Sequence, residues 1–142
     1  MTIKVSSFLI VISFVFGSCH GQPPDWKKSR NWRVYAISGQ RVFSVSVDTL
    51  SNLQSKLLDK DSLQYFLAKV TPIPKERTPV WMGSYLSSYE TAEGSLKKVE
   101  ISTYGGFFFD EASGKYYMLP RALSDRWLDY ISNSITQLKS GE

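Results

Sequence analysis

Cysteine and histidine, the side chains most often used for nucleophilic and metal chemistry, each occur once in this chain, at Cys19 and His20. Both follow directly after a hydrophobic segment at the start of the sequence, outside the region able to form a core. A serine–histidine pair, a cysteine–histidine pair and a histidine-rich zinc site all need these residues within the fold. We therefore expect a domain without disulfide, metal or cofactor, and we find no glycine-rich phosphate loop.

Carboxylates, lysines, tyrosines and serines remain for an enzyme, and the carboxylate pair that could face each other is Glu100 with Asp110. Asp110 and Glu111 are neighbours at a strand end and should point apart. If the strands carrying Glu100 and Asp110 pair, two facing acids could hydrolyse a glycosidic bond, such as one in a cell-wall glycan. This hydrolase is the alternative to a non-catalytic protein with solvated charges near its turns.

Aromatic residues are the stronger candidates, because they make up 14% of the chain and many follow residue 80. Alternation along a predicted strand 80–89 places Trp81, Tyr85 and Tyr89 on one face. Such a face, ringed by polar groups, suits a protein partner. The alternative is that these rings pack in the core, beneath the first hairpin or the last helix.

The string from Tyr104 through Gly105 and Gly106 to Phe108 is the most distinctive in the domain. Two glycines between strands mark a bulge, a sharp bend or a close backbone approach. In a functional interpretation they open a groove for a bound chain, with Phe108 exposed beside it and Tyr104 on the same surface as Glu100.

The first 18 residues have the three parts of an export signal: positive charge at Lys4, an apolar run over residues 8–16, and small residues before Cys19. A run of nine residues is too short for a membrane span, which needs about 20. The run Val15-Phe16-Gly17-Ser18-Cys19 resembles the relaxed lipobox of bacterial lipoproteins of the Bacteroidetes type, with Phe16 where an aliphatic residue is usual. The resemblance covers only the leader, and it implies cleavage before Cys19 and acylation of that cysteine.

The residue after Cys19 is His20. In the lipoproteins that this leader resembles, an aspartate at that position is typical of retention in the inner membrane, so the resemblance implies the outer membrane. Ordinary signal-peptidase cleavage after Gly21 is the alternative, and it would release a secreted or periplasmic protein without Cys19.

Cleavage before Cys19 removes 18 of the 142 residues and leaves 124, enough for one domain. Loss of Lys4 lowers the formal net charge from +4 to +3. The basic residues are spread along the chain, so nucleic acid is not an expected partner. Residues 19–31 contain Pro23 and Pro24 and a small basic group, and they are predicted to be a tether held near anionic headgroups.

The folded domain is predicted to cover residues 32–142, with α+β architecture. Residues 32–38 and 41–47 are β-rich and joined at Gly39-Gln40, which predicts an N-terminal hairpin. Leucines at helical spacing after Asp48, and again after Asp61, predict two short helices.

From residue 80 the pattern predicts four antiparallel strands in meander order, at 80–89, 96–104, 107–110 and 115–119. An apolar stripe from Leu123 to Leu138, behind Pro120 and a possible Ser124 cap, predicts a closing helix packed on the sheet. Taken together, these features favour a non-catalytic envelope lipoprotein that binds another protein. The partner would be an envelope component, or a toxic enzyme that this chain neutralises as an inhibitor or immunity protein.

Overall fold

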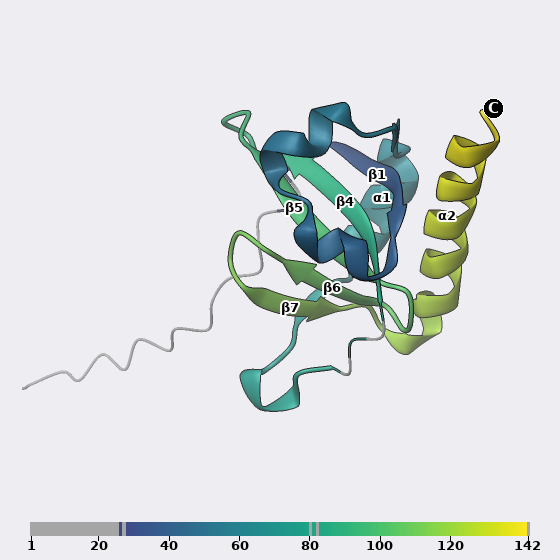
Figure 1. Cartoon of the computed structure of the whole chain (residues 1–142). Helices are drawn as coiled ribbons and strands as arrows, with labels where there is room; N and C mark the ends of the chain where they lie inside the picture. Colours follow the sequence, from purple (N-terminus) through teal and green to yellow (C-terminus); the bar gives the residue numbers. More distant parts are fainter. Residues whose placement is uncertain (1–25, 27, 80, 82, 142) are drawn as a thin grey trace, which may run out of the picture.

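The computed structural model describes Trp26, residues 28–79, Trp81 and residues 83–141. Its centre is a seven-stranded antiparallel sheet with the strand order β2-β1-β4-β5-β6-β7-β3 (Figure 1). The strands are β1 (Arg30–Ser38), β2 (Ser55–Leu57), β3 (Thr71–Pro72), β4 (Ser84–Glu90), β5 (Leu96–Ser102), β6 (Phe107–Asp110) and β7 (Lys115–Met118). The predicted α+β class is confirmed.

The four strands β4 to β7 follow one another both in the chain and in the sheet, so the predicted antiparallel meander is confirmed. Strand β6 begins and ends at the predicted residues. Directly opposed residues of antiparallel strands project from the same face of a sheet. The pairs Val99 with Asp110 and Glu100 with Phe109 therefore fix which side chains of the meander share a face.

Two α-helices, α1 (Lys60–Leu67) and α2 (Arg121–Ser140), cover one face of the sheet (Figure 1). Trp127 of α2 holds this layer together, because its ring lies 5.1 Å from that of Phe108 in β6 and 5.2 Å from that of Phe66 in α1. The predicted packing of the closing helix on the sheet is confirmed. The core on this face also includes Val34, Leu63, Leu67, Val99, Ile101, Tyr117, Leu119, Ile131 and Ile135.

Both predicted helix caps differ from the observed ones. The Asp59 side chain, not that of Asp61, accepts a hydrogen bond from the backbone N–H of Ser62 (2.8 Å) and caps α1. Helix α2 begins directly after Pro120, and Ser124 is a buried residue inside it. Pro120 occupies the N-cap position, where its missing N–H costs the helix no hydrogen bond.

The predicted N-terminal hairpin is wrong in its second half. Residues 39–44 form a 3₁₀ helix, η1 (Gly39–Ser44), instead of a strand. In a 3₁₀ helix residues three apart lie on one face. Val42 and Val45 have this spacing and pack against the sheet, whereas Phe43 is exposed.

The first of the two predicted short helices is also replaced. A second 3₁₀ helix, η2 (Val47–Asn52), precedes the short edge strand β2, which pairs with β1. Val47, Leu50 and Leu53 again recur every three residues and pack in one cluster. The segment η1 to η2 thus covers the second face of the sheet, opposite α1 and α2, over β1 and β4. A last 3₁₀ turn, η3 (Lys75–Arg77), follows β3.

The packed chain begins before Trp32, where the domain was predicted to start. Trp26 is buried, and its ring lies 5.4 Å from that of Trp32, 5.5 Å from that of Phe108 and 5.1 Å from that of Tyr117. Part of the predicted tether therefore contributes to the hydrophobic core.

Candidate binding face on the sheet

The three aromatic residues predicted to share one face are divided between both faces. Tyr89 is buried on the helix side, stacked on Trp32 at 5.1 Å, and Tyr85 packs against the same core. Trp81 lies on the second face, where its ring is 5.7 Å from that of Tyr116. The reason is Gly83, whose φ of +147° breaks the alternation before β4 begins at Ser84.

The two glycines make a close contact and do not open a groove. A Cβ on Gly106 would lie 2.8 Å from Leu119 Cβ and 2.9 Å from Ser124 Oγ, so this turn is pressed against the start of α2. Phe108, predicted to be exposed, is completely buried between Trp26 and Trp127. Of this string only Tyr104 is freely accessible, with 64% of its surface exposed.

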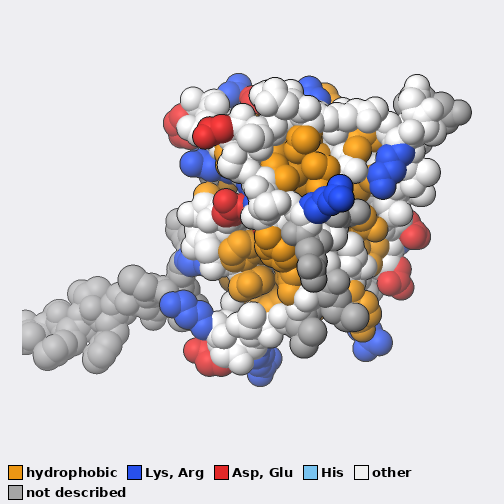
Figure 2. Space-filling model, in the orientation of Figure 1, with side chains coloured by type: hydrophobic (Ala, Val, Ile, Leu, Met, Phe, Trp, Pro, Cys, Tyr) orange, Lys and Arg blue, Asp and Glu red, His pale blue; other side chains and the backbone are white. Residues whose placement is uncertain are grey.

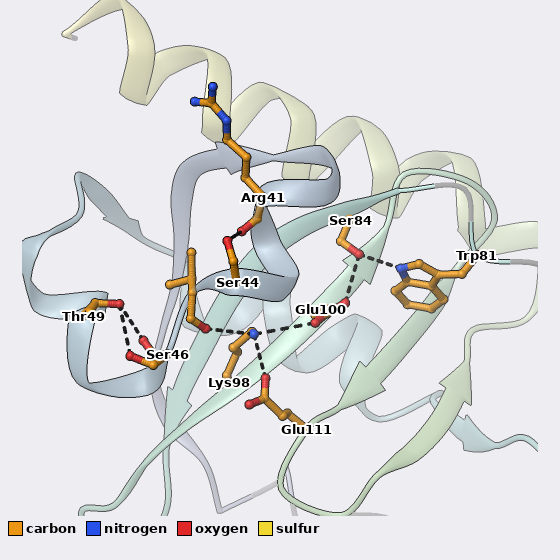
Figure 3. A network of polar contacts seen from close by, with 10 residues as sticks. Arg41, Ser44, Ser46, Thr49, Trp81, Ser84, Lys98, Glu100 and Glu111 are labelled. Atoms are coloured by element: carbon orange, nitrogen blue, oxygen red, sulfur yellow. Dashed lines mark hydrogen bonds and ion pairs between the residues drawn. The ribbon is translucent and has the colours of Figure 1, made fainter.

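A connected group of polar side chains crosses the second face from β4 to the turn after β6 (Figure 3). Trp81 Nε1 donates to Ser84 Oγ (2.6 Å), and Ser84 Oγ donates to Glu100 Oε2 (3.1 Å). Lys98 Nζ lies 3.7 Å from Glu100 Oε1 and 2.7 Å from Glu111 Oε2. We refer to these five residues as the ion network.

The ion network is almost entirely inside the protein. Ser84, Lys98 and Glu100 are buried, Trp81 is half-buried, and Glu111 is open to solvent. Burial raises the pKa of the Glu100 carboxyl above its usual value, and the Lys98 ammonium opposes this shift. Lys98 also donates to the Val45 carbonyl oxygen (3.0 Å), which ties the η1 to η2 segment to the sheet. The network therefore has a structural role at the centre of the second face.

Beside the ion network lies a row of aromatic rings that the η1 to η2 segment does not bury. The Phe109 and Tyr116 rings are 4.8 Å apart, and Tyr116 also contacts Trp81. All three side chains are half-buried, and next to them Met118 has 37% of its surface exposed. We call Trp81, Phe109, Tyr116 and Met118 the aromatic strip. In Figure 2 hydrophobic side chains gather over β6 and β7 on this side of the molecule.

The carboxylate pair required for glycan hydrolysis does not form. The strands of Glu100 and Asp110 do pair, but Asp110 opposes Val99 and therefore projects to the helix side. There Tyr89 OH donates to Asp110 Oδ1 (3.5 Å), and the Ser113 N–H donates to Oδ2 (3.1 Å). Burial and the neighbouring carboxylate raise the pKa of Tyr89 to about 12. The two acids lie on opposite faces of the sheet and cannot act on one bond.

Sequence reasoning missed Phe109, Tyr116 and Met118, although the signal was present. Strict alternation along 107–110 and 115–118 places Phe109 and Tyr116 on one face of the sheet and Phe108 and Tyr117 on the other. Once Phe108 is assigned to the core, its two neighbours must lie on the other face. The prediction that Phe108 would be exposed therefore concealed the strip.

Comparisons with protein-family models, with curated proteins and with solved structures find no match to this chain. Within residues 28–79 and 83–141, together with Trp26 and Trp81, no group of three potential metal ligands occurs. No helix in the described part of the chain is long and apolar enough to cross a membrane. The leader and Cys19 lie outside the described residues.

Proposed function

We propose that this chain is a non-catalytic lipoprotein of the bacterial cell envelope, anchored through Cys19, and that its aromatic strip binds another protein. The leader before Cys19 supports the anchor through its resemblance to a lipobox. The aromatic strip supports binding, because half-exposed aromatic rings surrounded by polar groups are the side chains that contribute most to protein interfaces.

The observation that carries this proposal is the contact between the strip and the ion network. Trp81 is held by Ser84, which is in turn bonded to the buried Glu100. Tyr116 and Phe109 are fixed by packing on each other. Rings that are already fixed lose little conformational freedom on binding, and such preorganisation increases affinity. The partner is therefore expected to present an apolar ridge, as an envelope component or a toxic enzyme could.

Site-specific photo-crosslinking tests the binding surface in living cells. A benzophenone amino acid at position 118 should crosslink one protein, which mass spectrometry would identify. The same amino acid at position 65, an exposed tyrosine on α1, is the control. A partner captured equally from both positions, or from neither, would contradict the proposal.

Binding of the purified partner should then depend on the strip. Tyr116→Ala removes a ring at its centre, and truncation of such an anchor weakens binding by about thirtyfold or more, equivalent to about 2 kcal/mol. Tyr65→Ala removes an exposed ring of the same kind from α1 and should leave the dissociation constant within about twofold. Equal effects of the two variants would exclude the strip as the contact surface.

The anchor is tested separately by labelling cells with an alkyne fatty acid. The protein should incorporate label, and Cys19→Ser should not. If Cys19→Ser incorporates as much fatty acid as the unsubstituted protein, acylation occurs at another residue. That result would leave the assignment of the strip unaffected.

A further inference from the structure

The strand register shows that the aromatic strip belongs to a larger apolar area on the second face. Phe107 of β6 opposes Met118 of β7, and Thr71 of β3 opposes Met118 from the other side. The Ile73 N–H donates to the Tyr116 carbonyl oxygen (2.9 Å), which places Ile73 opposite Tyr116. Opposed residues of antiparallel strands share a face, so the half-buried Phe107 and Ile73 adjoin the strip. We call the strip with these two residues the extended strip, and it spans β6, β7 and β3.

The edge of the sheet beside the extended strip is closed to a further strand. Successive residues of a strand direct their backbone groups to alternate sides. Because the Ile73 N–H points to β7, the outward-pointing positions are 72 and 74. Both are proline and have no N–H to donate. A partner must therefore bind the side chains of the face and not the backbone of the edge.

The extended strip has the width of one α-helix. Two strand spacings of about 4.8 Å separate β6 from β3, about 10 Å in all. An α-helix with its side chains is also about 10 Å wide. The neighbouring part of the same face is covered by η1 and η2, which contact β1, β4 and β5. A helix laid over β6, β7 and β3 would complete this layer, and an amphipathic helix has an apolar stripe to bury there.

The border of the extended strip at η3 is basic. Lys75 and Arg77 lie in η3, which follows β3, and Lys115 is the first residue of β7. All three side chains are exposed, and within the described part of the chain none of them forms an ion pair. Figure 1 shows η3 beside β7, and in Figure 2 basic side chains border the hydrophobic patch at this place. This border therefore attracts acidic groups.

The carboxylates close to the extended strip do not balance these charges. Glu76 is the only acidic residue of η3. Glu111, two residues after Phe109, lies 2.7 Å from Lys98 Nζ, so its charge is already neutralised. The surface that complements this border carries carboxylates beside its apolar residues.

The identity of the occupant follows from these features and rests on the proposed function, in which the strip binds another protein. We propose that the partner presents an amphipathic α-helix, whose apolar stripe packs on the extended strip and whose acidic residues face Lys75, Arg77 and Lys115. The partner is thus recognised by apolar residues at helical spacing together with carboxylates on one flank.

Crosslinks from several positions test whether the bound segment is a helix. The benzophenone amino acid is placed at positions 73, 109 and 118, one on each strand of the extended strip. Tandem mass spectrometry identifies the partner residue attached to each. These residues should lie in one segment, at separations of three, four or seven. Separations of two, typical of an extended chain, or residues from several segments would overturn the helix. Absence of products from all three positions would overturn the proposed function, and this inference with it.

Charge reversal tests whether the helix is acidic. Lys75→Glu/Arg77→Glu should weaken binding of the purified partner at least about tenfold, because like charges then face each other. The control Arg121→Glu/Lys139→Glu reverses two exposed charges on α2, on the opposite face, and should change the affinity less than about twofold. Lysines in place of the partner's acidic residues beside the crosslinked segment should restore binding to the first variant.

The outcome of charge reversal is separate from that of the strip. Equal losses in the two charge variants, or unchanged binding by Lys75→Glu/Arg77→Glu, would overturn the acidic helix as the occupant. Loss of binding in Tyr116→Ala would then still identify the strip as the contact surface.

Discussion

Removal of the Lys98 ammonium should destabilise the protein far more than removal of an ordinary lysine. Lys98→Met leaves Glu100 buried without its ion-pair partner, at an original separation of 3.7 Å. With an effective dielectric constant of about 20, two charges at that distance attract by about 4 kcal/mol. Loss of one partner of a buried pair costs about 3–5 kcal/mol in known cases. The Val45 carbonyl oxygen loses its donor as well.

Urea denaturation followed by circular dichroism measures this effect at pH 7. Lys97→Met is the matched control, because Lys97 neighbours Lys98 but is less buried and projects to the other face of β5. It should cost less than about 1 kcal/mol. The double variant Lys98→Met/Glu100→Leu removes both charges and should recover at least about 2 kcal/mol of the loss, because apolar replacement of a buried pair is often close to neutral.

The pH dependence gives an independent check of the same reasoning. The pKa of Glu100 is raised above its usual value of 4.5. The protonated side chain therefore contributes fully to stability below pH 4.5, and this contribution is lost as the pH rises through the raised pKa. Lys98 opposes that shift, so Lys98→Met should move the loss to a higher pH. Glu100→Gln should remove this pH dependence of the stability. A cost below about 1 kcal/mol for Lys98→Met, with no change in the pH profile, would refute the structural role of the network.

Three further predictions concern the fold. Gly106→Ala should lower the free energy of unfolding by about 1–3 kcal/mol in urea denaturation, because the new Cβ would meet Leu119 Cβ at 2.8 Å; an unchanged midpoint would mean that the turn yields freely. Trp26→Ala should cost about 3–5 kcal/mol by the same assay, as a core residue does and a tether residue would not. Asp59→Ala should accelerate amide hydrogen exchange in the first turn of α1, led by Ser62, whereas unchanged exchange would show that the cap is dispensable.

The meander and both α-helices could be predicted because their patterns are local. Alternation over 107–110 and 115–118 and the stripe from Leu123 to Leu138 each match one element with one buried side. Other parts required information that a local pattern lacks. The period of three in Val47, Leu50 and Leu53 lies close to the helical period of 3.6, and only packing on the sheet decides between the two.

The candidate site was harder to predict for two physical reasons. The side on which Trp81 lies depends on the backbone conformation at Gly83, which moves this residue to the face opposite Tyr85. The role of Trp26 depends on contacts with Phe108 and Tyr117, more than 80 residues later in the chain. Neither strand alternation nor composition reports on such contacts, so these two tryptophans were assigned to the wrong face and to the tether.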